Sequence, residues 1–275
     1  LSRSKLFSLA SMSTNFGYVW NANRFVTHEF NPISINYVNL AKTSPEFEQI
    51  LEDNPFLRSS FEQQFIAGMT YVYTYNGLVS AAKNHQFFLT STLDIAGNGL
   101  SLFSGGESAP QSILGLEYAQ YAKADVDLRY HLRLGSDTKL ATRVFGGIGL
   151  PYGNSEIMPF TKQYFSGGPY SVRAFRIRTL GPGTYAPEAG SNSFFDQSGN
   201  IRLEANIEYR FPIYSFVKGA IFADGTGVGL RIDIQGFVIR FDLAAPLRTP
   251  SLPIGERWDF DYKNPILNFA IGYPF

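Results

Sequence analysis

The chain has 275 residues, enough for one large β domain or two ordinary domains. Its 23 basic and 23 acidic side chains balance to a formal net charge of zero, which argues against a nucleic-acid partner because nucleic-acid binders normally carry a basic excess. The absence of cysteine excludes disulfides, thiolate metal sites and cysteine nucleophiles. The three histidines, His28, His85 and His131, are too far apart for a local metal motif, so we expect neither a metal nor another cofactor.

Aromatic and charged residues are both abundant, with 25 Phe and 16 Tyr beside the 46 ionised side chains (23 basic and 23 acidic). A soluble chain usually buries its aromatic residues and keeps few of them, so this mixture indicates two environments of opposite polarity. A membrane β-barrel with a wet lumen provides both. The sequence has no run of about 18 or more apolar residues, so no transmembrane helix is predicted.

Hydrophobic residues recur mainly with a period of two, which is the period of a β-strand. About thirteen strands are predicted from this pattern. Their approximate spans are 4–11, 12–20, 27–39, 60–76, 86–96, 117–134, 138–150, 159–167, 199–212, 216–224, 225–235, 236–245 and 264–275. Residues 44–53 predict a short loop helix with Pro45 near its start. Long connections at 97–112 and 168–198 are rich in Gly, Ser and Pro, which is typical of exposed loops.

The predicted strand at 199–212 shows the alternation most clearly. Its apolar face carries Ile201, Leu203, Ala205, Ile207, Tyr209 and Phe211, and its polar face carries Arg202, Glu204, Asn206, Glu208 and Arg210. A soluble β-sandwich also alternates in this way and is the alternative fold. Rows of opposite charges and strands longer than the usual five or six residues (roughly 9–11 are needed to cross a bilayer) favour a barrel. We therefore predict an all-β, antiparallel transmembrane β-barrel occupying residues 1–275 as one domain.

Two patterns that could carry other chemistry are better explained by strands. The run Gly225-Thr-Gly-Val-Gly229 superficially resembles a nucleotide-binding loop, but a strand pattern follows it instead of a helix. Glu204 and Glu208 could form a carboxylate pair for glycoside hydrolysis. Because they alternate with Arg202 and Arg210 on one face, a ladder of charges facing the lumen is the preferred interpretation, and no enzymatic activity is expected.

The long connection at 168–198 begins within a distinctive sequence, Phe165-Ser-Gly-Gly-Pro-Tyr-Ser-Val-Arg-Ala-Phe175, and also contains Gly181-Pro-Gly183. The candidate site residues in this motif are Gly167, Gly168, Val172, Arg173, Ala174 and Phe175. The position of the motif, just before the last five predicted strands, argues against a chance tripeptide.

The C-terminal twelve residues form an amphipathic strand pattern. One face carries Leu267, Phe269, Ile271, Tyr273 and Phe275, and this stripe resembles the C-terminal signal of outer-membrane barrels, which ends in Phe or Trp. Gly272 and Pro274 interrupt the same segment, and both weaken strand pairing. We therefore predict that this strand forms a weak seam with the first strand of the barrel, which would lie upstream of Leu1.

Together these features resemble the barrel of the BamA/TamA family of outer-membrane protein assembly factors, within the POTRA-barrel translocase superfamily. The resemblance is specific over roughly the last 120 residues, where Val172, Arg173 and Phe175 match the family motif Val-Arg-Gly-Phe. Ala174 departs from the usual Gly. The resemblance implies that the long loop folds into the barrel and that Arg173 meets acidic residues at positions matching Glu208 and Asp224. A buried arginine without such partners would be very costly.

The resemblance also implies a function. The expected role is insertion and folding of outer-membrane proteins, with client strands templated at a lateral seam of a barrel in the Gram-negative outer membrane. The expected partners are unfolded outer-membrane proteins, accessory assembly subunits or periplasmic factors, and outer-membrane lipids, with no nucleic acid. A two-partner secretion translocator and a passive porin or outer-membrane channel remain as alternatives.

Comparison with the family predicts parts that this sequence does not show. The family barrel has sixteen strands and is preceded by periplasmic POTRA domains, so we expect the N-terminal strands, the POTRA domains and the export signal to lie outside these residues. A family loop is also expected between Asp224 and Gly225, with a two-residue hairpin as the alternative.

Overall fold

The computed structural model describes residues 2–3, 7–53, 58, 61, 65–80, 83–104, 110–113, 115–185, 197–258 and 260–275. The chain groups into two compact units. Unit 1 contains Leu1–Thr74, Thr90–Asp125 and Gly147–Gln163, and unit 2 contains Tyr75–Leu89, Val126–Gly146 and Tyr164–Phe275. The long strands β4, β5, β8 and β9 each contribute residues to both units.

The described residues form one large sheet of twelve strands in the order β1-β2-β3-β4-β5-β8-β9-β10-β11-β12-β13-β14. These strands are β1 (Ser2–Arg3), β2 (Phe7–Asn21), β3 (Val26–Thr43), β4 (Phe65–Asn76), β5 (His85–Ala96), β8 (Tyr121–Arg133), β9 (Lys139–Pro151), β10 (Ile201–Tyr214), β11 (Val217–Ala223), β12 (Thr226–Ile234), β13 (Phe237–Ala245) and β14 (Ile266–Ile271). A separate pair joins β6 (Ser112–Ile113) to β7 (Leu116–Glu117). Successive strands of the large sheet are hydrogen-bonded neighbours, and the pairs from β10 to β14 are antiparallel. The predicted all-β fold with one large, mainly antiparallel sheet is confirmed.

The helices are short and lie in connections. They are α1 (Pro45–Asp53), α3 (Asn98–Ser104) and the 3-10 turns η1 (Gly77–Val79) and η2 (Phe160–Lys162). The helix predicted at 44–53 is therefore confirmed, and α3 was not expected within the loop at 97–112. None of the helices in the described part of the chain has the length and apolarity needed to cross a membrane.

Three strand predictions need correction. The segments 4–11 and 12–20 are not two strands: β2 runs without a break through Phe7–Asn21, and residues 4–6 lie outside the described part. The strand predicted at 159–167 is absent, because Pro159 leads into η2 and only isolated bridges follow at Tyr164 and Ser166. The last strand ends at Ile271, because Gly272 adopts a φ of +84° that a strand cannot continue.

The turn between β11 and β12 corrects a fourth expectation. Phe222 pairs with Gly227, so Asp224 and Gly225 lie at the tip of a tight hairpin and not at a lost loop. A Cβ atom added to Gly225 would lie 2.3 Å from Cβ of Ala174 and 2.8 Å from the carbonyl oxygen of Ala245. Glycine at this position therefore lets the hairpin approach the family motif closely, where a longer loop would need room of its own.

In unit 1, an aromatic cluster anchors α1 against the beginning of β2. The rings of Phe7 and Phe47 stack with centroids 4.7 Å apart, and those of Phe61 and Phe160 stack at 4.5 Å. All four side chains are buried. Also in unit 1, Lys162 of η2 pairs with Asp94 of β5 at 2.7 Å, and Asp94 accepts a hydrogen bond from the hydroxyl of Tyr121 in β8.

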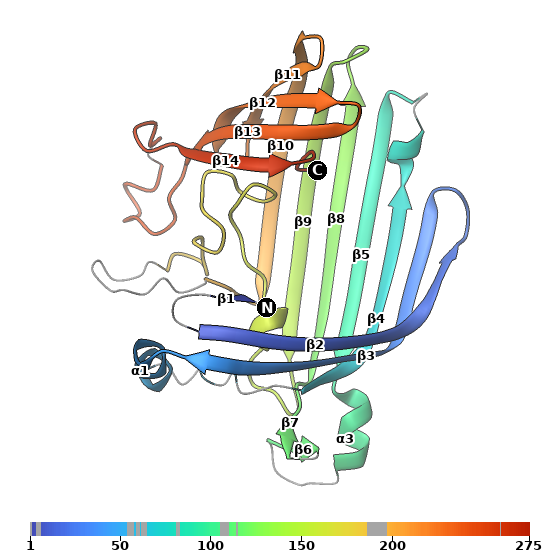
Figure 1. Cartoon of the computed structure of the whole chain (residues 1–275), viewed down its shortest axis with the longest axis vertical. Coiled ribbons are helices and arrows are strands. Elements are labelled where there is room, and N and C mark those ends of the chain that lie inside the picture. The colour runs from blue at the N-terminus through green and yellow to red at the C-terminus, as the bar shows by residue number, and fades with distance from the viewer. Residues whose placement is uncertain are drawn as a thin grey trace. The chain divides into compact units, whose positions relative to one another are not determined.

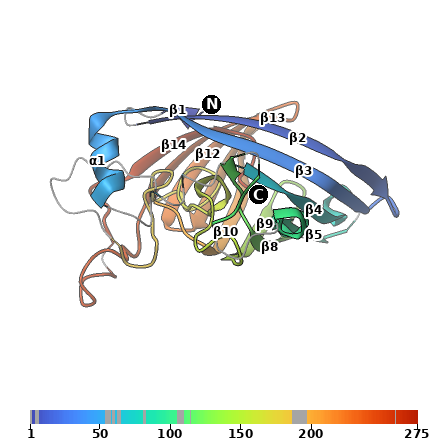
Figure 2. The same cartoon turned by 90° about the horizontal axis from the view of Figure 1, so that it is seen from below.

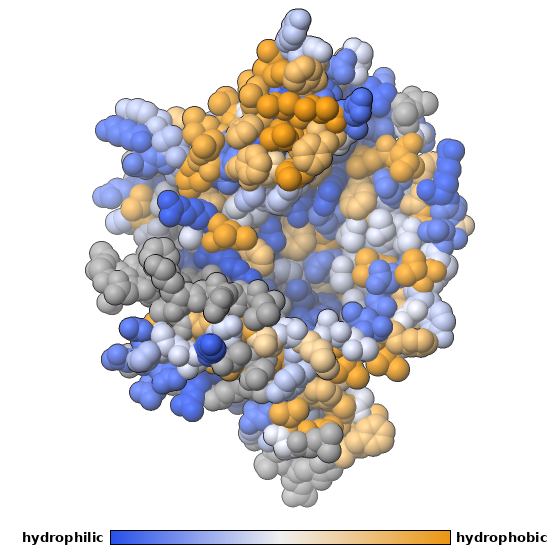
Figure 3. Space-filling view, viewed as in Figure 1, coloured by the Kyte–Doolittle hydropathy of each residue, from blue (hydrophilic) through white to orange (hydrophobic). Residues whose placement is uncertain are grey.

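In unit 2, β10 to β14 lie side by side in the sheet (Figure 1), and the side chains on its two faces differ in polarity and burial. From Leu203 to Arg210 in β10 burial alternates strictly, with Glu204, Asn206, Glu208 and Arg210 buried and the residues between them exposed. The face that carries these side chains is called the charged face below, and the opposite one the apolar face. The apolar side chains gather over β12 to β14 in Figure 3 and include Val228, Leu230, Leu243, Leu267, Phe269 and Ile271, all exposed. The alternation predicted for 199–212 is confirmed.

Candidate functional site

The motif loop, residues 164–185, is closed at its base and folded tightly within unit 2. Tyr164 and Gly199 exchange two main-chain hydrogen bonds of 2.8 Å. Gly167 and Gly168 have φ values of +99° and +92°, a region that favours glycine. A Cβ atom on Gly167 would lie 2.1 Å from the carbonyl oxygen of Arg176, so the loop can fold back on itself only with glycine there.

Arg173 lies at the centre of the candidate site, and its side chain has no exposure to solvent. Its Nε donates to Asp224 at 2.8 Å, and its Nη1 donates to Glu208 at 2.5 Å and to Asp242 at 3.4 Å. The guanidinium also stacks on Phe222, with Cζ 3.4 Å from the ring centroid. The expected pairing of Arg173 with both Glu208 and Asp224 is therefore present, and Asp242 is an additional partner.

The partners of Arg173 belong to a larger buried ion cluster on the charged face. Glu208 also accepts from Arg210 at 2.7 Å and from Arg231 at 3.0 Å. Asp242 pairs with Arg231, and with Arg240 at 3.2 Å. The ion cluster, as defined here, consists of Arg173, Arg210, Arg231, Arg240, Glu208, Asp224 and Asp242. Since unpaired buried charges are strongly destabilising, each member depends on the others to remain in place.

The electrostatic environment keeps Arg173 charged. Burial alone lowers the pKa of its guanidinium, but the carboxylates of Asp224, Glu208 and Asp242 more than offset that effect and raise the pKa above its ordinary value. Because Arg173 stays charged and faces three carboxylates, it attaches the loop to the charged face. A guanidinium that stays protonated is not suited to proton transfer. No cluster of metal-ligating side chains occurs among the residues that the structure describes.

A second set of polar contacts holds the loop at Ser171, which sequence reasoning did not single out. The Ser171 hydroxyl donates to Glu204 at 2.7 Å and accepts from the main-chain N–H of Gly167 at 3.1 Å. Glu204 in turn pairs with Arg143 at 2.9 Å and with Arg202. Glu204 and Glu208, the two glutamates considered for glycoside hydrolysis, thus each form ion pairs with at least two arginines. This supports the interpretation of the polar face as a ladder of charges.

The remaining motif residues pack beside Arg173. Ala174 is buried in a small apolar cluster with Phe222 and Ala244, and Phe175 packs against it from a partly buried position. Val172 is half-buried. Ala174 replaces the Gly of the family motif, and its methyl group occupies the space that Gly225 leaves free.

The C-terminal stripe is only partly as predicted. Leu267, Phe269 and Ile271 are exposed on the apolar face, but Tyr273 is half-buried and Phe275 is buried. The reversal at Gly272 carries the last residues to the charged face, where Arg210 donates to the carbonyl oxygen of Phe275 at 2.9 Å. The expectation of a five-residue apolar stripe is therefore wrong for its last two members, because the period of two ends at Gly272.

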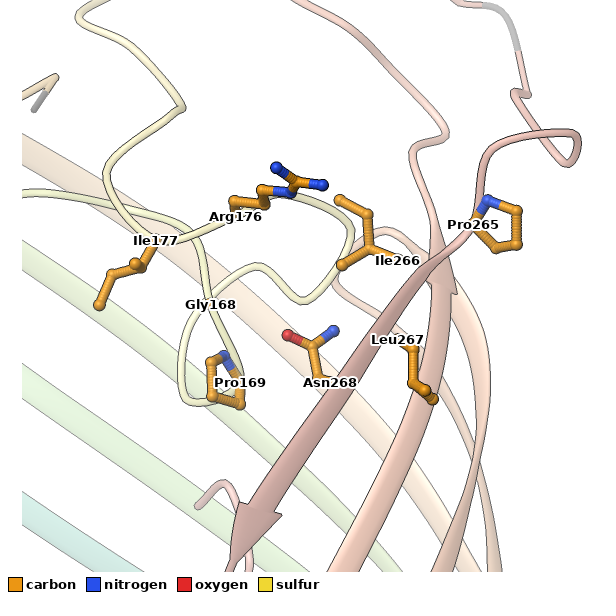
Figure 4. A pocket seen from close by; sticks show the side chains of 8 residues that line it. All are labelled: Gly168, Pro169, Arg176, Ile177, Pro265, Ile266, Leu267 and Asn268. Carbon is orange, nitrogen blue, oxygen red and sulfur yellow. The ribbon is translucent and has the colours of Figure 1, made fainter. Parts of the chain in front are cut away.

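The motif loop, drawn in yellow in Figure 2, is also bound directly to the last two strands. The Asn268 side chain donates to the carbonyl oxygen of Arg173 at 2.8 Å, and Arg240 donates to the carbonyl oxygen of Pro169 at 2.6 Å. A pocket lies between the loop and the beginning of β14 (Figure 4), lined by Gly168, Pro169, Arg176, Ile177, Pro265, Ile266, Leu267 and Asn268. The loop and β14 therefore form one connected structure.

A large, mainly antiparallel sheet whose charged face binds an arginine-centred loop is the arrangement expected of an outer-membrane-type β-barrel protein. Residues 9–225 match the Omp85 superfamily domain, and the chain belongs to this superfamily. The fold is also similar to that of a solved structure, BamA from Haemophilus ducreyi lacking POTRA domains 1–3, and together with the superfamily match this confirms the resemblance to BamA-like barrels. That structure superposes with a TM-score of 0.63 at 14% identity, over 96% of this chain and 54% of that one, and shows the shared fold.

Curated relatives match a shorter part of the sequence. Sorting and assembly machinery component 50 homolog B of Xenopus laevis and the corresponding homolog of Xenopus tropicalis are each 27% identical over 90 residues. These residues are 33% of this chain and 19% of each relative. The chain thus spans about one fifth of the length of the curated relatives that it matches.

Proposed function

We propose that this chain is the barrel part of an assembly factor that inserts and folds β-barrel proteins in the outer membrane of a Gram-negative cell, as a multi-pass barrel itself. Its partners are unfolded outer-membrane proteins, accessory assembly subunits or periplasmic factors, and the surrounding lipid. Membership of the Omp85 superfamily supports the general role. The names of the curated relatives, sorting and assembly machinery components, point the same way.

The observation that carries the mechanism is the position of β14 at the end of the strand order. In the described sheet β14 has one hydrogen-bonded neighbour, β13. Alternate residues of an edge strand direct their N–H and C=O groups away from the paired strand. These groups are unsatisfied in lipid and are a template for an incoming strand, so pairing with a client strand removes the cost of exposing both edges.

The side chains of β14 are compatible with an edge strand that faces lipid. Leu267 and Phe269 expose 68% and 60% of their surface on the apolar face, so β14 can face lipid while its edge offers main-chain groups. The ion cluster and the loop hold the other face of β14 through Asn268. No cofactor or energy source enters the mechanism, because the stability of the folded client gives the direction.

Proline at position 269 tests whether the edge is used. Gly272 donates to Val238 on β13, and Phe269 lies an odd number of residues away, so its N–H points to the free edge. Phe269→Pro therefore removes one edge donor without removing a bond to β13. We expect Phe269→Pro to slow client folding well below the rate with Phe269→Ala, which loses the ring alone. The rate is measured as the mobility shift of a urea-unfolded outer-membrane barrel protein added to vesicles that contain the full-length protein.

The two variants separate the mechanisms. Equal client folding rates with Phe269→Pro and Phe269→Ala, both folded in the vesicles, would contradict templating at this edge. Ion conductance without any effect of the protein on client folding would favour a passive channel.

A further inference from the structure

Tyr170 makes a contact that none of the roles described so far requires. Its hydroxyl donates a hydrogen bond to the main-chain carbonyl oxygen of Ile271, the last residue of β14. Its ring lies against Arg240 of the ion cluster, with the guanidinium carbon 5.1 Å from the ring centroid. The loop therefore contacts the main chain of the edge strand, in addition to the side chain of Asn268.

Both neighbours of Tyr170 in the sequence are fixed, so the tyrosine is held in place. The carbonyl oxygen of Pro169 accepts from Arg240 at 2.6 Å, and the hydroxyl of Ser171 donates to Glu204 at 2.7 Å. The carbonyl oxygen of Tyr170 itself accepts from Arg143 at 3.3 Å. The position of the Tyr170 hydroxyl is thus determined by the buried charges of the charged face.

The direction of the Ile271 carbonyl shows which side of β14 Tyr170 occupies. Ile271 and Gly272 share one peptide group, and the Gly272 N–H donates to Val238 on β13 at 2.8 Å. In a trans peptide the C=O points opposite to the N–H, so the Ile271 carbonyl points away from β13 and toward the free edge. Tyr170 therefore occupies an acceptor that an incoming strand would use.

We propose that Tyr170 is a positioning residue that fixes the C-terminal end of β14 and, by occupying the Ile271 carbonyl, limits how far along this edge another strand can pair. The edge groups of Leu267 and Phe269 remain open to a partner, and those of Ile271 become available only when Tyr170 releases them. The limit on pairing rests on the function proposed above, but the fixing of the strand end does not. The ion cluster thereby sets both the place of the loop and the usable length of the edge.

Tyr170→Phe removes the hydroxyl and keeps the ring on Arg240, so it isolates the contact. In the full-length protein without any client, we expect amide hydrogen exchange at Gly272 to become about fivefold faster, the effect of losing one neutral hydrogen bond. Tyr214→Phe is the matched control, because Tyr214 is 78% exposed and contacts neither the loop nor β14 in the described structure. Exchange at Gly272 that is the same in Tyr170→Phe and Tyr214→Phe would overturn the proposal.

A second measurement adds a client. Cysteine is placed at position 267 or 271, and disulfide formation with a single cysteine in the last strand of a urea-unfolded outer-membrane barrel protein is compared. Tyr170→Phe should raise the ratio of cross-linking at 271 to that at 267 by about fivefold. An unchanged ratio would overturn the limit on pairing. Fast exchange at Gly272 without cross-linking at either position would contradict the proposed function while leaving the fixing of the strand end supported.

Discussion

Replacing Glu208 with Ala should lower the free energy of unfolding by about 5 kcal/mol, the upper end of the range for breaking a buried ion pair. Glu208 pairs with three arginines, Arg173, Arg210 and Arg231, and its side chain is completely buried. The ion cluster has four guanidiniums and three carboxylates, so losing Glu208 leaves four positive charges facing two negative ones. Uncompensated positive charge in a buried site has no solvent to stabilise it. Denaturant unfolding followed by tryptophan fluorescence measures the change.

The matched control for this substitution is Glu256→Ala. Glu256 is exposed in the connection between β13 and β14, and its side chain forms no ion pair with the residues that the structure describes. Removing this carboxylate should leave the unfolding midpoint almost unchanged. If Glu208→Ala shifted the midpoint no more than Glu256→Ala does, the buried cluster would not contribute to stability as described.

Arg173→Ala should also be strongly destabilising, by about 3 kcal/mol, but less so than Glu208→Ala. Arg173 is the only member of the ion cluster that the motif loop supplies, and removing it leaves three guanidiniums with three carboxylates. The charge balance thus survives, but Asp224 loses its arginine partner and the loop loses its attachment. Loop release is measured as faster proteolysis within residues 164–185, and the stability change by the same denaturant unfolding.

Arg176→Ala provides a control of the same residue type on the same loop. Arg176 is exposed, three positions from Arg173, and shows no ion pair in the described structure. Its removal should change stability by no more than about 0.5 kcal/mol, as for an ordinary surface substitution. Comparable proteolysis of the loop in Arg173→Ala and Arg176→Ala would contradict the attachment, and a larger stability loss for Arg173→Ala than for Glu208→Ala would contradict the charge count.

The strands of unit 2 could be predicted from the sequence because local and tertiary requirements agree there. Between Leu203 and Arg210 of β10 every second residue is charged or polar, and the same residues are the buried ones. The pairing of Arg173 with Glu208 and Asp224 followed from resemblance to a family motif and from the cost of an unpaired buried arginine. Asp242 was missed although its alternation with Ile239, Phe241 and Leu243 placed it on the polar face.

Other features could not be predicted because they depend on contacts that are distant in sequence. The bond from Ser171 to Glu204 spans 33 residues, and the bond from Tyr170 to Ile271 spans 101. The end of β14 was misplaced because hydrophobic alternation continues to Phe275, whereas the backbone turns at Gly272 with positive φ. Alternation reports which face a side chain would occupy in a strand, and it does not report where the strand ends.

Cross-linking of a folding client to apolar-face residues of unit 2 is the most direct test of templating at the edge of β14. Single cysteines at Leu267 on β14 and at Val228 on β12 are compared in the full-length protein, with a urea-unfolded outer-membrane barrel protein carrying one cysteine in its last strand. Both positions are exposed on the apolar face, at 68% and 57%, but β12 is paired on both sides and β14 on one. Templating at the edge of β14 predicts transient disulfides at position 267 while the client folds and only background at 228. Equal cross-linking at the two positions, or none at 267 while the client folds at the accelerated rate, would contradict templating at the edge of β14.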